Sequence, residues 1–257
     1  MIVVLASPRD TGARRLVDVW GAGRARLLTV DDLSRPGWRV HTEDPAASRA
    51  VVSGEVVEAG ELVGVVTRLP AVTAGEIRRI RAEDRDYAAS EMSAFLNYWL
   101  SVLPCPVLNP PAPSGLCGPG WRPEQWVLTA RRLGVPVRPR SRELPPYLPD
   151  DGNCGGSPGS RAHGSPSGGA GIQVTVIGDR CIGGEAHGVA GPAKALAAAA
   201  GVPMLTTVFE EHGSDVRFVD AHPWTNAFDP RVTDALLDHF SRYGAVSVSR
   251  SGRSVIR

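Results

Sequence analysis

Hydrophobic residues are concentrated in short runs over the first seventy positions, and each run has the length of a strand. Ile2–Ala6, Arg26–Val30 and Leu62–Thr67 are such runs, and Arg49–Val57 alternates between apolar and polar side chains. Gly12–Trp20 instead has its apolar residues at helical spacing. Continuous apolar runs are typical of strands buried on both faces, whereas alternation is typical of a strand with one solvated face. The pattern predicts a sheet with helices packed against it.

The helical period takes over after residue 73. Thr73 and Glu76 have the spacing of a capping box, so we expect a long helix to begin at Thr73. Pro104 is expected to end this helix. Trp99 lies on the apolar face and is predicted to be a core residue.

The composition changes in the middle of the chain. A short strand at Val107–Leu108 and a helix from Pro123 to Gly134 precede a stretch, from about 136 to 171, that is rich in Gly, Ser and Pro. Such a stretch cannot bury enough apolar surface to offset the entropy of ordering. We predict a flexible linker over 150–171. Three origins stay open for it, namely the scar of a deletion, a domain boundary and a mobile lid.

Regular patterns return after the linker. The run IQVTVIGDRCIGG predicts a hairpin with Gly178–Asp179 as its turn, and an alanine-rich helix ends at Gly201. Two strands follow, at Met204–Phe209 and Val216–Val219. The last predicted helix has Asp229 as its N-cap, followed by a proline at the first helical position.

Composition excludes several classes of protein. The chain has 257 residues, 42% of them hydrophobic and 21% charged, and a formal net charge of +1, so no global field favours nucleic acid. No run approaches the roughly 20 apolar residues of a membrane span, and the amino terminus does not resemble a signal peptide. The four cysteines form no CxxC pair. We therefore expect a cytoplasmic protein with reduced thiols and neither a nucleic-acid nor a membrane partner.

Three segments together resemble parts of a known family. LPCPVLNPPAPSGLCGPGWRPEQWVLTARRLGVPV has a strand that ends in an Asn-Pro turn before a helix, VTVIGDRCIGG is a hairpin, and GVPMLTTVFEEHGSDVRFVDAHPWTNAFDPRVTDALLDHF forms the carboxy-terminal stretch. In this order they resemble the ATP-grasp ligases, especially the RimK-like and graspetide-type enzymes. In that family, about a hundred residues form the phosphate-covering sheet and carry the lysines that contact ATP. In this chain the linker occupies their place. The chain therefore resembles a truncated, degenerate member that lacks the central ATP-binding subdomain.

The resemblance implies an α/β fold and a domain organisation. Residues 1–112 correspond to a Rossmann-like domain of the kind that precedes an ATP-grasp core. A helix-containing connector follows over 113–149, then the linker over 150–171. Residues 172–245 correspond to a reduced ATP-grasp-like α+β part, and 246–257 are expected to be a frayed tail.

The metal ligands implied by the resemblance are only partly present. The position of the family's metal-binding Asp is held by Val208, and the Glu-x-Asn pair is replaced by Asp220 and His222. Valine cannot coordinate a metal, and histidine is an unusual ligand for Mg²⁺. Asp220 and His222 are therefore at most a degenerate metal site, or a proton-transfer pair; the alternative is a hydrogen-bonded loop end with an exposed histidine. Lys194 follows the gap and cannot replace the missing lysines.

Four residues are candidates for binding a substrate or partner: Glu91, Asn109, Trp121 and Arg122. Glu91 could bind a cation or a substrate amine, but a solvated helix edge is the simpler interpretation. Trp121 and Arg122 follow a Gly-Pro-Gly turn and could meet a partner carboxylate, or could simply pack the start of a helix. Asn109 belongs to the Asn-Pro turn of the resemblance.

Two functions from different classes follow. The first is a non-catalytic or accessory ATP-grasp-like protein that needs no cofactor alone and binds a peptide or an enzyme, for example a full-length ligase. The second is an ATP-dependent carboxylate-amine ligase that uses ATP and Mg²⁺ at a divergent site, or at one completed by another chain. A homo-oligomer is compatible with both functions.

Overall fold

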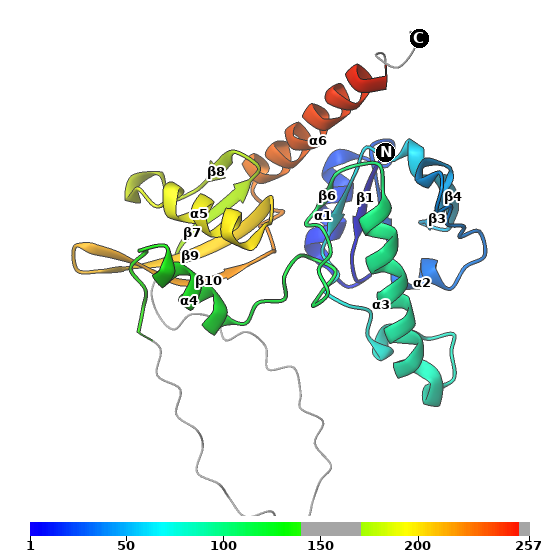
Figure 1. Ribbon diagram of the computed structural model, residues 1–257, viewed down its shortest axis with the longest axis horizontal. Helices are drawn as coiled ribbons and strands as arrows, with labels where there is room; N and C mark the ends of the chain where they lie inside the picture. Colours follow the sequence, from blue (N-terminus) through cyan, green and yellow to red (C-terminus); the bar gives the residue numbers. More distant parts are fainter. Residues whose placement is uncertain (140–170, 252–257) are drawn as a thin grey trace, which may run out of the picture.

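The computed structural model describes residues 1–139 and 171–251, with side chains described up to residue 242. The described chain contains two four-stranded sheets, which share no strand, and a separate two-stranded sheet. A parallel sheet belongs to the amino-terminal half and an antiparallel sheet to the carboxy-terminal half (Figure 1). The chain is therefore a mixed α/β protein, as the sequence predicts.

The amino-terminal half is built on a parallel sheet with the strand order β2-β1-β5-β6. Its strands are β1 (Ile2–Leu5), β2 (Ala25–Leu28), β5 (Gly64–Thr67) and β6 (Val107–Leu108). The sheet is covered on both faces, which explains its nearly continuous apolar runs. Helices α1 (Thr11–Trp20) and α6 (Pro230–Ser251) pack against one face. Helix α3 (Arg85–Val102) packs against the other face, with Trp99 fully buried as predicted.

One predicted strand is in fact a hairpin. Instead of a single strand over Arg49–Val57, the structure has β3 (Arg49–Val52) paired antiparallel with β4 (Glu55–Glu58). Ser53 and Gly54 have positive φ angles of 51° and 81°, which suits a two-residue hairpin turn. The two strands form a sheet of their own and contribute to the core on the α3 face.

The long helix begins later than predicted. Thr73 and Glu76 do form a capping box, but it encloses only the 3₁₀ turn η3 (Ala74–Glu76). The chain is extended at Ile77 (φ −90°, ψ 96°), whose side chain is buried in the core. A second 3₁₀ turn, η4 (Ala82–Asp84), then leads into α3. Burial of Ile77 therefore interrupts a segment whose local sequence favours a helix.

The carboxy-terminal half is built on an antiparallel sheet with the order β10-β9-β7-β8. Its strands are β7 (Ile172–Ile177), β8 (Arg180–Ile182), β9 (Met204–His212) and β10 (Asp215–His222). The helices α4 (Pro123–Arg132) and α5 (Ala190–Ala200) pack on one face of this sheet. The turn between β7 and β8 is at Gly178–Asp179, as predicted.

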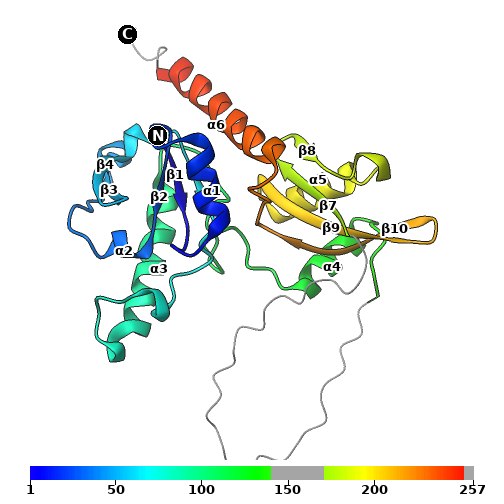
Figure 2. The same ribbon diagram turned by 180° about the vertical axis from the view of Figure 1, so that it is seen from behind.

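Helix α6 joins the two halves. Its buried residues Val232, Leu236 and Phe240 contact strands of the parallel sheet, and the same cluster contains Ile177 and Met204 of the antiparallel sheet. Figure 2 shows α6 running from the antiparallel sheet past the face of the other sheet that α1 covers. A single apolar core therefore crosses the junction.

Two expectations concern segments at the edge of the described chain. The predicted linker, 150–171, lies outside the described residues except for Gly171. Helix α6 continues to Ser251, so the part of the predicted frayed tail that is described is helical. No proline interrupts this segment. Within 1–139 and 171–251, no helix is both long and apolar enough to cross a bilayer.

Candidate functional site

Two rows of side chains cross the antiparallel sheet on the face opposite α4 and α5. In one row, Gln173, Val208 and Asp220 lie opposite one another on β7, β9 and β10. In the other row, Thr175 and Thr206 are register partners, and His222 is the partner of Thr206 on the next strand. Residues in register and residues two apart on a strand share a face of the sheet. These rows form the candidate site.

The positions that the resemblance assigns to metal binding therefore lie together. Val208 is paired with Asp220 in the register of β9 and β10, and His222 is two residues further along β10. Val208 is buried, at 8% exposure, while Asp220 and His222 are half-buried. The Asp220 carboxylate accepts a hydrogen bond of 2.9 Å from the main-chain N–H of Ala221.

Hydroxyl groups occupy the centre of the site. The Thr175 and Thr206 side chains are both buried and hydrogen-bond to each other at 3.0 Å. Their polar atoms are thus satisfied within the sheet. The site presents two hydroxyls, one carboxylate, one imidazole and the carboxamide of Gln173 along two neighbouring rows.

These side chains do not form a magnesium site of the ATP-grasp kind. Mg²⁺ requires oxygen ligands in near-octahedral geometry, usually from carboxylates and water. Of the three matched positions, only Asp220 supplies a carboxylate, because Val208 has no ligand atom and His222 offers a nitrogen. No group of three or more His, Cys, Asp or Glu side chains able to hold a metal ion occurs in the part of the chain that the structure describes.

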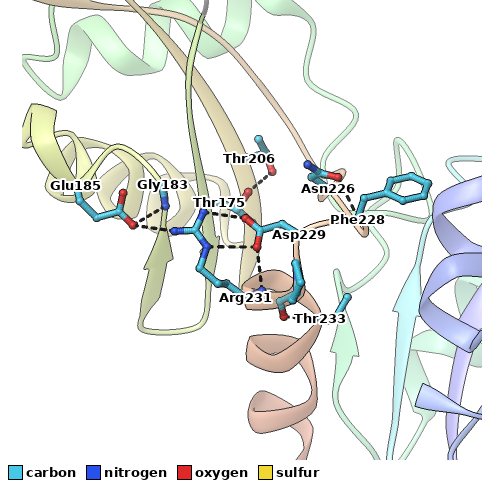
Figure 3. A network of polar contacts seen from close by, with 10 residues as sticks. Thr175, Gly183, Glu185, Thr206, Asn226, Phe228, Asp229, Arg231 and Thr233 are labelled. Atoms are coloured by element: carbon cyan, nitrogen blue, oxygen red, sulfur yellow. Dashed lines mark hydrogen bonds and ion pairs between the residues drawn. The ribbon is translucent and has the colours of Figure 1, made fainter. Parts of the chain in front are cut away.

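An ion-pair network fixes the start of α6 beside β8. Arg231, in the first turn of α6, bonds to Asp229 at 2.9 Å and reaches Glu185 at 3.5 Å (Figure 3). Glu185 also accepts a hydrogen bond from the main chain of Gly183 at 3.1 Å. Asp229 caps the helix through the main-chain N–H of Arg231, as predicted. The hydrogen bond from Arg231 is the main cause that lowers the pKa of Asp229.

Asn109 has a structural position at the junction of the two halves. It is fully buried, and its side-chain amide makes two hydrogen bonds with the main chain of Met204, at 2.7 and 2.9 Å. Gly118 lies against it: a Cβ there would come within 3.4 Å of Asn109 and 2.9 Å of Val202. The amide is therefore fully engaged inside the protein.

The remaining sequence candidates lie on different elements. Glu91 is exposed on α3. Trp121 packs edge-on against Trp126, with ring centroids 4.7 Å apart, and both contribute to the core beneath α4. Arg122 is exposed before α4, where its main-chain N–H bonds to Gln125 at 2.8 Å. Within the described ranges, no hydrogen bond, ion pair or ring contact joins Glu91, Trp121 and Arg122.

A buried ion pair at the junction was not predicted. Arg68 follows β5 and forms a two-pronged pair with Asp10 at 2.8 and 3.2 Å, and only 10% and 18% of these side chains are exposed. Arg68 also donates to the carbonyl of Thr225 at 3.3 Å and lies 5.9 Å from the Trp224 ring. Burial alone would raise the pKa of Asp10, but hydrogen bonds from Arg68 and the main chain of Ala13 outweigh burial and lower it. Arg68 directly follows β5, and Asp10 is the N-cap of α1 in the connection after β1, so both lie at the carboxyl ends of neighbouring parallel strands.

The sequence matches no protein-family model, and no curated protein matches it either. The structure, in contrast, is similar to that of the macrocyclase MdnC from Microcystis aeruginosa MRC, bound with precursor peptide MdnA. The TM-score is 0.62 at 10% identity, and the comparison covers 94% of this chain and 100% of that chain.

Two further structures have the same architecture. The ATP-grasp ligase PsnB, complexed with a variant of its minimal precursor, Mg and ADP, has a TM-score of 0.58 at 15% identity, with 93% of this chain and 98% of that chain covered. A ligase associated with RiPPs from Chryseobacterium gregarium, in complex with ADP and a leader and core peptide, has a TM-score of 0.57 at 9% identity, with 94% and 96% covered. This chain therefore has an ATP-grasp-like fold.

Proposed function

We propose that this chain is a non-catalytic or accessory ATP-grasp-like protein that binds a peptide or an enzyme partner. The observation that carries the proposal is the pair formed by Val208 and Asp220. It places a valine in the register position where the resemblance implies an acidic metal ligand. The similar solved structures hold peptides, which supports a peptide as the partner.

The chemistry of the family explains why this pair matters. An ATP-grasp ligase makes an acyl phosphate, and metal ions and cationic side chains must neutralise the charge that develops on the phosphates. One carboxylate at the site cannot hold metal ions in the usual way. Lys194 is the only lysine of the chain and is exposed on α5, on the opposite side of the sheet from the two rows. Truncation of the central subdomain would agree with these replacements.

The alternative is an ATP-dependent carboxylate-amine ligase that modifies peptides. It is favoured by the fold itself, because the similar solved structures are peptide-modifying ATP-grasp ligases, one of them complexed with Mg and ADP. In that case a divergent site around Asp220 and His222 would act, or a second chain would complete the site. ATP and Mg²⁺ would then be the cofactors.

Calorimetric titration of the full chain with ATP, in the presence of Mg²⁺ and in the presence of EDTA, separates the two functions. The proposal expects no magnesium-dependent binding with a Kd below about 1 mM. Tighter binding that requires Mg²⁺ would contradict it and favour the ligase. An ATP-hydrolysis assay with a full-length ATP-grasp ligase added then tests whether another chain completes the site.

A further inference from the structure

A cavity of about 590 Å³ opens at the carboxyl ends of the parallel strands in the amino-terminal half. It is lined by the loop that follows β1, by the segment that follows β5, and by the turn η3 and the residues around it. Its volume lies within the roughly 300–1,000 Å³ of small-ligand pockets. The cavity is separate from the two rows on the antiparallel sheet.

The topology of the sheet marks this place as a binding position. The chain runs from β1 to β2 on one side of the sheet and from β5 to β6 on the other, so the connections that follow the neighbouring strands β1 and β5 run in opposite directions. In open α/β sheets, ligands bind in the crevice outside the carboxyl ends of the strands at such a switch point. The loops after β1 and β5 are the two that enclose the cavity.

Arginines dominate the charge of the lining. Arg9, Arg14, Arg68 and Arg78 line the cavity together with the carboxylates of Asp31 and Glu76. Because Asp10 neutralises Arg68, four positive groups oppose three negative ones, which leaves an excess of one positive charge. One of the two carboxylates, Glu76, already accepts bonds of 3.3 and 3.1 Å from the main-chain N–H and hydroxyl of Thr73.

The arginines differ in how far they are already engaged. Arg68 is held by Asp10, and Arg14 donates to the carbonyl of Pro8, which ties it to the loop after β1. Over 1–139 and 171–251, the guanidinium groups of Arg9 and Arg78 take part in no hydrogen bond or ion pair. Free guanidinium groups that line a cavity match the geometry of phosphate and carboxylate oxygens.

The geometry points to a binding site for a small multivalent oxyanion, that is, a ligand with a phosphate group or clustered carboxylates, held by Arg9, Arg14 and Arg78. Arg68 forms the wall of this site next to the junction with the carboxy-terminal half. Among the described residues, Asp10 pairs with Arg68 and not with Arg9, Arg14 or Arg78, so a di- or trianion with several oxygens can contact all three of these guanidinium groups at once, whereas a single carboxylate offers only two oxygens. The inference does not depend on the proposed function.

Titration calorimetry of the full chain with inorganic phosphate and, separately, with citrate tests the site. We expect a Kd below about 1 mM for at least one anion, and the stronger of the two identifies phosphate or carboxylate as the preferred group. The double variant Arg14→Gln/Arg78→Gln should lose at least about tenfold in affinity, because each arginine supplies charge-assisted hydrogen bonds.

Neighbouring arginines provide the matched control. Arg15 and Arg79 are exposed and do not line the cavity, so Arg15→Gln/Arg79→Gln removes the same charge and should change affinity by less than about twofold. If the first double variant does not fold, Arg9→Gln replaces it, because that exposed side chain has no partner to lose. Equal losses in both double variants, or no binding of either anion below about 10 mM, would overturn the inference. Since these titrations contain neither Mg²⁺ nor nucleotide, their failure leaves the proposed function untouched.

Discussion

The side-chain amide of Asn109 hydrogen-bonds to both main-chain groups of Met204: it accepts from the N–H and donates to the carbonyl. Asn109 thus takes the place that a neighbouring strand would have beside Met204. Asn109 directly follows β6 of the parallel sheet, and Met204 begins β9 of the antiparallel sheet. The two residues are 95 positions apart in the chain and are both fully buried. The two halves are thus tied together by polar bonds inside an apolar core.

Replacing Asn109 by Ala should destabilise the protein strongly. The variant leaves a buried N–H and a buried carbonyl of Met204 without partners, at a cost of about 1–3 kcal/mol for each group. We expect a loss of about 2–5 kcal/mol in the free energy of unfolding, measured by urea denaturation. Asn97→Ala is the control, because that half-buried amide makes one bond, of 2.9 Å, to Ala112. A loss no larger than that of Asn97→Ala would show that Asn109 does not hold the junction.

The ion pair of Asp10 and Arg68 should make stability depend on pH in the acidic range. The pKa of Asp10 is lower in the folded protein than its usual value of about 3.9, so the unfolded chain binds more protons in this range. The contribution of Asp10 is therefore complete above about pH 5 and is lost as pH falls through the folded pKa. Asp10→Asn should cost about 2 kcal/mol at pH 7, and its difference from the wild type should shrink towards pH 3.

The exposed pair of Arg26 and Glu55 provides the comparison for Asp10→Asn. The Glu55 side chain is 68% exposed, so Glu55→Gln should change stability by less than about 1 kcal/mol at any pH. Both variants are measured by denaturation at several pH values. A constant difference between Asp10→Asn and the wild type from pH 7 to pH 3 would exclude Asp10 as the source of the pH dependence.

Locally encoded features could be predicted from the sequence. The turn at Gly178–Asp179, the cap at Asp229 and the burial of Trp99 depend on residues close together in the chain, and all three are found in the structure. The resemblance matched Val208 and Asp220 to metal-ligand positions, but their cross-strand register was not predicted, because the second strand was expected to end at Val219 and β10 extends to His222.

Features that depend on distant partners could not be predicted. Asp10 and Arg68 are separated by 58 residues, and nothing in either local sequence indicates the other. The hairpin of β3 and β4 was missed because the whole segment was interpreted as one alternating strand, although Ser53–Gly54 is a turn signal and the last three residues of β3 are all buried. The expected helix from Thr73 failed because tertiary burial of Ile77 overrides local propensity.

The contact of Gly64 with Phe240 predicts a strong coupling between β5 and α6. A Cβ at Gly64 would lie only 2.1 Å from the ring of Phe240, which is itself 1% exposed. Gly64→Ala should therefore cost about 2–4 kcal/mol through overpacking. In a Phe240→Ala background the same substitution should cost less than about 1 kcal/mol, because the clash is removed.

Chemical denaturation of the four proteins of this cycle measures the coupling between Gly64 and Phe240. Gly191→Ala is the control, because that exposed glycine in α5 has nothing within 4 Å of the added methyl group. It should stabilise the helix by up to about 1 kcal/mol. An equal cost for Gly64→Ala in both backgrounds would mean that α6 does not pack against β5 in the way the structure has it.

The accessory function proposed above predicts that Val208→Asp creates metal affinity at this position. The new carboxylate would lie in register with Asp220, where the Cβ atoms of opposite residues are about 4.5–5.5 Å apart. Without metal, a second carboxylate at a buried position should cost about 1–3 kcal/mol. Mn²⁺ or Mg²⁺ at millimolar concentration should restore part of this loss, since binding to the folded state raises the melting temperature. Val208→Asn, which is of similar size but neutral, should be destabilised and gain nothing from metal.

A wild-type melting temperature that rises with Mg²⁺ as much as that of Val208→Asp would show that the site around Asp220 already binds the ion, and would favour the ligase over the accessory protein.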